Sequence, residues 1–345
     1  MKKIKTLQRI LKPKEMLYID SSSDVFNLID LNKSFNPNEY DAGLLIGKKH
    51  VYLICEVLFY PHVRHLKGLK VLKADSDAYL ASSKTFIEDI ERILKREKAV
   101  RLGLTNPSLS RHFKRYITFH FMSPSKVLGI VKSGREIDAL RACSGIMKDI
   151  LERVPGLLKT SVTDLELRNE IDNMIYGSGA QRRYVPTLVG FNAKTVYPTI
   201  INKKLKRGNL VLVDFGIMKN GTGLSIARTL PYGSLSSNKK KHLSIVNDGL
   251  EVMKSVIQKG IEIRAIDSEY RQFMGSHKLD NSFIDYSVKL PGTSYYEETN
   301  SIKDRTELRD NSVIKISSSL FVPGRYGIKN EELILVKGNS NETLL

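Results

Sequence analysis

The chain has 345 residues, of which 41% are hydrophobic and 27% are charged, a composition typical of a soluble globular protein with one large or two ordinary domains. No apolar run approaches the ~20 residues of a membrane span, and no apolar signal-peptide region follows the basic first residues, so we expect a cytoplasmic protein that does not bind membranes. The formal net charge of +18 permits attraction to nucleic acid or acidic surfaces, but we favour the interpretation that it belongs to a lysine-rich solvated surface.

The excess of basic residues is uneven along the chain. Residues 1–132 hold 24 Lys and Arg against 13 Asp and Glu, whereas the remainder holds 31 against 24. No basic motif interleaved with aromatic residues accompanies this charge. Cys55 and Cys143 lie in apolar or helical contexts without metal-ligand spacing, which predicts two buried thiols and neither a disulfide nor a zinc site.

The first part of the chain alternates strand-like and helical patterns, which is typical of an α/β domain. Apolar residues at helical spacing predict a helix over 82–99. A segment that contains serine and proline, residues 122–126, is a candidate boundary, so we expect a domain over residues 1–125. Strands are predicted at 42–47, 50–60, 68–74 and 101–105.

The second part opens with two helices that carry capping boxes, in which a hydroxyl residue precedes a glutamate by three positions. Ser133 and Glu136 begin the first, and Thr163 and Glu166 begin the second. Helices followed by strands then occur twice, which indicates two related halves. The further predicted elements are strands in 185–191 and 209–216, a turn at 219–223, helices at 238–258 and 265–274, and strands at 312–322 and 332–338.

The run GNLVLVDFG followed by IART resembles the core motif of the pita-bread metallopeptidases, which include prolidase, aminopeptidase P and methionine aminopeptidase. In that family a strand Asp is followed eleven residues later by a second Asp and then by a short Arg-Thr tail. Asp214 occupies the first position and Ser225 the second, and Arg228 and Thr229 match the tail.

Two later blocks extend the resemblance. FIDYSVKLPGTSYYEE is similar to the family's GHGxG element and the His-Glu pair beyond it, which places Lys289 at the ligand His, Tyr296 at the second His and Glu297 at the Glu. SSSLFVPGRYGIKNEELILV is similar to the Glu-Pro strand and the second Glu ligand, which places Ser317 and Glu331 at the two ligand positions.

A shorter match, VGFNAKTVYPTI, resembles the family stretch with a substrate-contacting His, where Tyr197 stands. The resemblance covers about residues 125–345. It implies an α/β (α+β) architecture, with a C-terminal pita-bread (creatinase/aminopeptidase) domain over 126–345 and the smaller α/β domain of the creatinase and prolidase branch over 1–125. It also implies a homodimer. The candidate binding-site residues are Tyr197, Arg228, Tyr296 and Glu297.

The chemistry of the family requires four carboxylates and an imidazole, which hold two divalent ions such as Mn, Co or Zn and activate a bridging water. Of these five positions only Asp214 and Glu331 are still carboxylates. Ser225 and Ser317 are neutral hydroxyls, and the Lys289 ammonium has no lone pair to offer a metal. We therefore expect no metal, no other cofactor and no catalytic residue. We predict instead that Lys289 neutralises Asp214 and Glu331 in one cluster.

The leading interpretation is a pseudoenzyme, a catalytically inactive Xaa-Pro peptidase homologue that binds a peptide, a protein or nucleic acid. The alternative is an active Xaa-Pro dipeptidase or aminopeptidase, which would require different ligands; His242 and His277 lack the family spacing. A metal-free hydrolase like creatinase would need a His base, and Lys289, Tyr296 and Tyr197 stand at the family's His positions. Binding of nucleic acid rests on the net charge alone and is compatible with the first interpretation.

Overall fold

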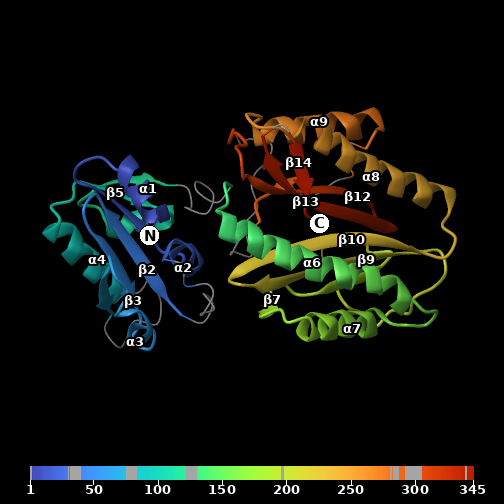
Figure 1. Ribbon diagram of the computed structural model, residues 1–345, viewed down its shortest axis with the longest axis horizontal. Helices are drawn as coiled ribbons and strands as arrows, with labels where there is room; N and C mark the ends of the chain where they lie inside the picture. The colour runs from blue at the N-terminus through green and yellow to red at the C-terminus, as the bar shows by residue number, and fades with distance from the viewer. Residues whose placement is uncertain are drawn as a thin grey trace. The chain divides into compact units, whose positions relative to one another are not determined.

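The protein forms two compact units, Met1–Leu128 and Gly129–Leu345, each with its own hydrophobic clusters (Figure 1). The structure, a computed structural model, describes residues 2–29, 31, 40–74, 84–121, 130–195, 198–279, 282, 287–291, 305–338 and 340–345.

The first unit is built on a six-stranded mixed sheet in the order β4-β3-β2-β1-β5-β6. Alternate strand residues face opposite sides, so one side packs against α1 and α2 and the other against α4 and a 3₁₀ turn. The elements are α1 (Lys2–Ile10), β1 (Glu15–Ile19), α2 (Ser22–Ile29), β2 (Ala42–Gly47), β3 (Val51–Cys55), α3 (Tyr60–Val63), β4 (Lys70–Lys73), α4 (Lys84–Arg96), β5 (Arg101–Leu104), the 3₁₀ turn Pro107–His112 and β6 (Ile117–His120).

Most predicted elements of this unit are present, with one correction. The strand predicted over 50–60 ends at Cys55, because the chain turns there and a proline in the first turn of α3 starts a short helix. The elements that precede residue 42 were not predicted. Both cysteines are buried and free, as predicted.

The second unit contains, in its described residues, two helices followed by four strands, twice over, which confirms the predicted repetition. Its strands form two sheets, β10-β9-β7 with β8 also paired to β9, and β11-β12-β13-β14. The elements are α6 (Gly134–Leu157), α7 (Asp164–Gly177), β7 (Arg182–Arg183), β8 (Leu188–Phe191), β9 (Asn209–Lys219), β10 (Thr222–Tyr232), α8 (Ser237–Val256), α9 (Ile263–Ser276), β11 (Val288–Lys289), β12 (Val313–Val322), β13 (Tyr326–Lys337) and β14 (Ser340–Thr343).

Local signals fix the ends of these elements. Both predicted capping boxes are present: the Ser133 hydroxyl accepts from the Glu136 amide at 3.4 Å, and the Thr163 hydroxyl accepts from the Glu166 amide at 3.1 Å. The β9–β10 hairpin turns at Asn220 with Gly221, whose positive φ angles of 51° and 73° are those of a tight primed turn.

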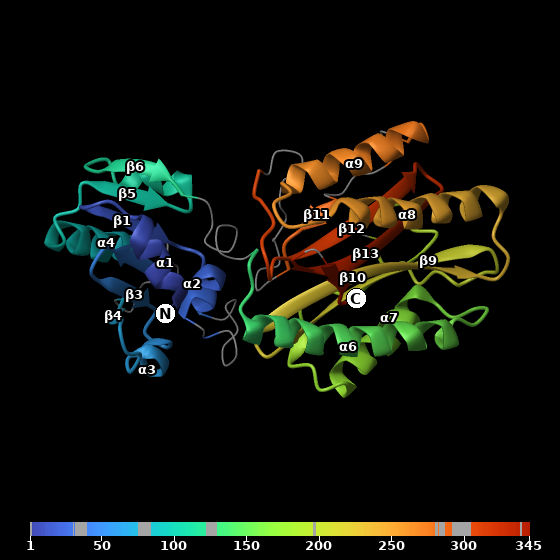
Figure 2. The same ribbon diagram turned by 45° about the horizontal axis from the view of Figure 1, so that its top comes forward.

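The strands of this unit lie between the helix pair α6 and α7 and the helix pair α8 and α9 (Figures 1 and 2). On β9, Val213 and Phe215 pack with the helices α6 and α7, so Asp214 between them faces the opposite side. On β12, Ile314 and Ile316 pack in the same way with α8 and α9. The inner faces of the two sheets therefore carry the polar side chains, together with buried apolar residues such as Leu212, Val313 and Leu333. Within the described parts of the chain, no helix has both the length and the apolar character needed to cross a membrane.

Candidate functional site

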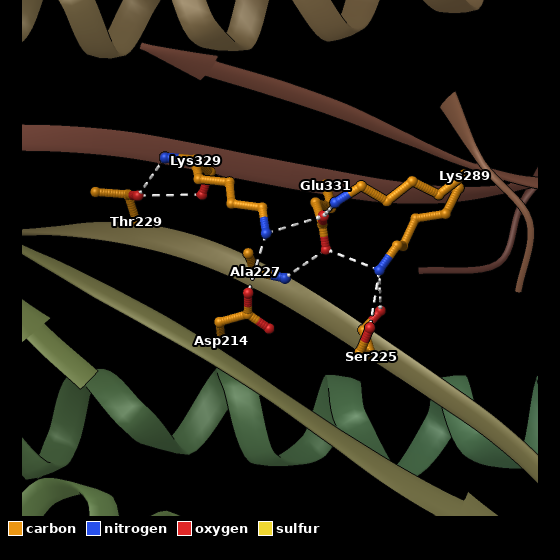
Figure 3. A network of polar contacts seen from close by, with 8 residues as sticks. Asp214, Ser225, Ala227, Thr229, Lys289, Lys329 and Glu331 are labelled. Atoms are coloured by element: carbon orange, nitrogen blue, oxygen red, sulfur yellow. Dashed lines mark hydrogen bonds and ion pairs between the residues drawn. The ribbon is translucent and has the colours of Figure 1, made fainter. Parts of the chain in front are cut away.

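Five charged side chains meet on the inner faces of the two sheets (Figure 3). This charged cluster consists of Asp214 on β9, Lys289 on β11, Lys315 on β12, and Lys329 and Glu331 on β13. Every member is buried, with no more than 8% of the residue exposed. Burial of so many charges requires that they neutralise one another, because isolated ions are costly to remove from water.

Strand register brings four of the five residues onto one face. Lys289 lies opposite Lys315 in the β11–β12 pair, and Ser317 lies opposite Glu331 in the β12–β13 pair. Residues two apart on a strand share a face, so Lys315 joins Ser317, and Lys329 joins Glu331. The sheet pairing alone therefore gathers three lysines around a single glutamate.

Glu331 is the centre of the cluster. Its Oε1 lies 3.4 Å from the Lys289 ammonium and 3.3 Å from that of Lys329, and its Oε2 lies 3.2 Å from that of Lys315. The Ala227 amide also donates to Oε2 at 3.0 Å. Burial by itself raises the pKa of Glu331, but the ammonium groups of Lys315, Lys329 and Lys289 hold it well below its usual value. Glu331 is therefore an ionised carboxylate with both oxygens occupied.

The other acid and the remaining lysine contacts complete the cluster. Lys329 forms an ion pair with Asp214 at 3.0 Å, and Lys315 donates to the Ser225 hydroxyl at 2.8 Å and to its carbonyl at 3.2 Å. Burial lowers the pKa of Lys315; Glu331 and Asp214 oppose that effect and the neighbouring lysines add to it. The five side chains of the cluster are thus three ammonium groups and two carboxylates.

Side chains also join the two sheets where β10 meets β13. The Thr229 amide donates to the Asn330 side chain at 2.8 Å, and its hydroxyl donates to the Lys329 carbonyl at 3.1 Å while accepting from the Lys329 amide at 2.9 Å. With the contact from Ala227 to Glu331, these bonds satisfy backbone groups at the edges of both sheets. Glu331 therefore has a structural role besides its electrostatic one.

Residues 138–338 match the family model of metallopeptidase family M24. The chain belongs to this family. Its second unit accordingly has the pita-bread fold, preceded by an α/β unit as in the two-domain prolidases.

Similar M24 proteins include an Xaa-Pro dipeptidase of Pyrococcus furiosus, 22% identical over 296 residues that cover 83% of each chain. An uncharacterized peptidase of Methanocaldococcus jannaschii is 26% identical over 226 residues, 64% of each chain, and one of Staphylococcus saprophyticus is 24% identical over 224 residues, 64% of this chain and 63% of that protein. In the last two, the match spans less than two thirds of the relative's length.

Solved structures show the same fold over nearly the whole chain. An Xaa-Pro dipeptidase from Bacillus anthracis superposes with a TM-score of 0.83 and 18% identity, covering 100% of this chain and 97% of that one. Prolidase from Pyrococcus furiosus superposes with a TM-score of 0.80 and 18% identity, covering 99% and 98%.

The structure places the predicted M24 ligand positions as follows. Lys289 contacts Glu331, as predicted, whereas the ion pair of Asp214 is made by Lys329. Ser225 accepts from Lys315, and the Ser317 hydroxyl is buried without a hydrogen-bond partner among the described residues. Burial lowers the pKa of the half-buried Arg228 guanidinium, an effect that Glu332 and Glu331 oppose. Tyr197, Tyr296 and Glu297 lie outside the described residues.

Sequence reasoning missed the roles of Lys315 and Lys329. Both stand two residues from a predicted M24 ligand position on the same strand, so alternation along β12 and β13 puts them on the face of Ser317 and Glu331. Applying this spacing around each matched position would have identified both lysines.

The described donor groups do not fit a pair of divalent ions. Asp214 and Glu331 supply the carboxylates, but the groups beside them are three ammonium ions and two hydroxyls, and an ammonium has no lone pair for a metal. Throughout the described ranges, no group of three or more His, Cys, Asp or Glu side chains is arranged to hold a metal ion.

Proposed function

We propose that this protein is a pseudoenzyme of the M24 family, which uses no paired metal ions and binds a peptide or protein without hydrolysing it. The observation that carries the proposal is that each carboxylate oxygen of Glu331 has at least one lysine ammonium group within 3.4 Å. In this protein, lysine ammonium groups surround the carboxylate beside which a metallopeptidase would need divalent metal ions.

The electrostatics support this proposal. At an effective dielectric constant of about 20, a dication about 4 Å from one ammonium is disfavoured by roughly 8 kcal/mol, and three ammonium groups surround Glu331. Without a metal, no hydroxide nucleophile forms at neutral pH in the way that two-metal hydrolases require.

Metal content and peptide turnover together test the proposal. The purified protein is incubated with manganese, cobalt or zinc, desalted and analysed for bound metal, and its turnover of Xaa-Pro dipeptides and tripeptides is measured with each metal added. The Pyrococcus furiosus Xaa-Pro dipeptidase serves as the positive control. We expect no stoichiometric metal and no turnover. Two bound ions per chain with metal-dependent hydrolysis would overturn the proposal.

The alternative function is that of an active Xaa-Pro dipeptidase or aminopeptidase, the activity named for several relatives. It would need metal ligands other than the five matched positions. His242 contacts the Tyr326 hydroxyl at 3.1 Å and the His277 ring packs on Phe273, so the contacts of these imidazoles lie outside the charged cluster. The same turnover assay decides between the two functions.

Binding of nucleic acid is a second candidate function, which can coexist with the first. Lys239 at the start of α8 donates to the Gly208 carbonyl at 2.6 Å, which brings two basic segments together. We expect retention on DNA or RNA that falls steeply with salt and weakens when Lys240 and Lys241 are changed to Gln. The exposed cations of the two basic segments that Lys239 joins are Lys204, Lys206, Arg207, Lys240 and Lys241.

The predicted homodimer is tested separately by light scattering.

A further inference from the structure

Positive charge is concentrated in one part of the second unit. Residues 173–247 contain 12 Lys and Arg but a single acid, Asp214, whereas residues 133–172 and 248–345 together contain 19 Lys and Arg against 23 Asp and Glu. Asp214 is buried in the charged cluster, so it does little to neutralise the surface of this stretch. Solubility alone does not require such a concentration, which therefore favours an anionic partner.

Two lysines lie where the basic segments of this stretch, residues 203–207 and 239–241, come together. The Lys203 ammonium donates to the Phe191 carbonyl at 2.7 Å. The Lys239 ammonium donates to the Asn192 side chain at 3.1 Å and to the Gly208 carbonyl at 2.6 Å. Because Phe191 and Asn192 are consecutive, the two ammonium groups converge at the end of β8, and both side chains remain partly exposed.

The partners of this lysine pair are neutral oxygens. Within the described parts of the chain, neither Lys203 nor Lys239 forms an ion pair with an acid. Burial lowers the pKa of Lys239, and the positive charge of Lys203 lowers it further. An ammonium group has three N–H donors. The bonds to described residues use one donor of Lys203 and two of Lys239, which leaves three for the oxygens of an anion.

We propose that Lys203 and Lys239 bind a phosphate group of a nucleic-acid backbone and that the exposed cations beside them contact neighbouring phosphates. This inference rests on the second candidate function, binding of nucleic acid, and gives that function a site. A DNA duplex carries a negative charge about every 1.7 Å along its axis, so one stretch of backbone can meet several cations at once. The exposed cations are Lys204, Lys206, Arg207, Lys240 and Lys241.

The fixed position of the pair distinguishes it from the exposed lysines. A lysine side chain loses rotamer freedom when a ligand holds it, but Lys203 and Lys239 are already held by their hydrogen bonds. Lys239 also lies over the Tyr326 ring, 5.5 Å from its centroid. Lys204, in contrast, is exposed and attracted by Glu166, whose pKa it helps to lower. The pair should therefore contribute more to binding per charge than the exposed cations do.

Fluorescence anisotropy with a short labelled DNA duplex tests the inference. We expect the logarithm of the association constant to fall linearly with the logarithm of salt concentration, by about 0.9 for each phosphate contacted. Polyglutamate and vesicles that contain phosphatidylserine are the competing polyanions. At matched concentrations of negative charge, we expect unlabelled duplex to displace the probe about tenfold more effectively than either of them.

Variants show whether the lysine pair is responsible. Lys203→Gln combined with Lys239→Gln removes both charges but keeps side chains that can donate to the same carbonyls. We expect affinity to fall about tenfold or more and the salt slope to fall by about 2. Lys148→Gln combined with Lys278→Gln removes the same net charge from exposed sites outside the basic segments and should change the slope by less than about 0.5.

Two further variants separate charge from folding. Lys203→Arg combined with Lys239→Arg retains both charges and should retain most of the affinity. Far-UV circular dichroism checks the fold of every variant. If the double glutamine variant does not fold, Lys239→Gln alone supplies the test, with an expected fall in salt slope of about 1.

Two results would overturn the inference while nucleic-acid binding itself stands. One is a glutamine variant of the pair whose affinity and salt slope match those of the Lys148 and Lys278 control. The other is displacement of the duplex by polyglutamate or vesicles as effectively as by DNA. Failure of the unaltered protein to bind duplex even at low salt would instead remove the candidate function, so the two failures are distinguishable.

Discussion

Replacing Lys329 with methionine removes the ammonium that pairs with Asp214 on the neighbouring sheet, while it preserves most of the side-chain length. Lys329 lies 3.0 Å from the Asp214 carboxylate and 3.3 Å from that of Glu331, and its side chain is 4% exposed. After the substitution Glu331 still contacts two ammonium groups, whereas Asp214 loses its ion pair with Lys329. We therefore expect the loss of stability to arise mainly from Asp214, whose carboxylate loses its ion pair with Lys329.

The magnitude follows from the distance and the burial. At an effective dielectric constant of about 20, unit charges 3.0 Å apart attract by about 5 kcal/mol. Relief of repulsion between Lys329 and Lys315 offsets part of this attraction, as does the partial solvation of Asp214. Breaking one side of a buried ion pair typically costs about 3–5 kcal/mol, so we expect a loss near 3 kcal/mol, a large share of a typical domain stability of about 5–15 kcal/mol.

A double-mutant cycle isolates this interaction. Lys329→Met, Asp214→Asn and the double variant are compared by urea unfolding followed by far-UV circular dichroism, because the chain contains no tryptophan. The double variant should be much less destabilised than the sum of the two single variants, since neither charge remains unpaired. Lys240→Met on the exposed face of α8 is the control, and it should change stability by less than about 0.5 kcal/mol.

Two results would contradict this reasoning. A loss below about 1 kcal/mol for Lys329→Met would mean that the ion pair is not buried as the structure has it. Strict additivity in the cycle would mean that Lys329 and Asp214 do not interact.

Three further predictions concern other parts of the chain. Burial raises the pKa of the Cys55 and Cys143 thiols to about 12, so both should be inert to Ellman's reagent in the native protein and react after unfolding. Native reactivity would contradict the burial. Thr163→Ala removes a capping box and should cost about 1 kcal/mol by urea unfolding, whereas Thr163→Ser should retain most of the stability. Hydrogen bonds from Arg141 lower the pKa of Glu342 to about 2, so this carboxylate stabilises the fold above its unfolded value of 4.5 and the effect is lost as pH falls towards 2. Glu342→Gln should therefore flatten the acid limb of the stability profile, and an unchanged limb would refute the assignment.

Local features of the sequence were sufficient to predict much of the fold. A capping box needs only residues three apart, and the Asn220–Gly221 turn needs only two neighbours that tolerate positive φ. Strand alternation depends on the two-residue period alone. Spacing within the motifs is likewise enough to match Asp214 and Glu331 to predicted ligand positions of one M24 site, although the two residues lie on different sheets.

The strand predicted over 50–60 shows where local patterns fail. Its apolar run continues past Cys55, but the proline of α3 and the turn that precedes it end the strand there. Hydrophobicity alone does not separate a buried strand from a buried turn and short helix. Only the tertiary structure shows that this strand ends at Cys55.

The sequence by itself determined the family and the alternation of each strand, and it predicted that three of the five ligand positions no longer carry the family's ligand types. Only the tertiary structure decided that Lys329 pairs with Asp214, 115 residues earlier in the chain, and that Lys315 shares Glu331 with Lys289. The physical reason is that alternation assigns each side chain to a face locally, whereas the partner across that face depends on how two sheets far apart in sequence close on each other.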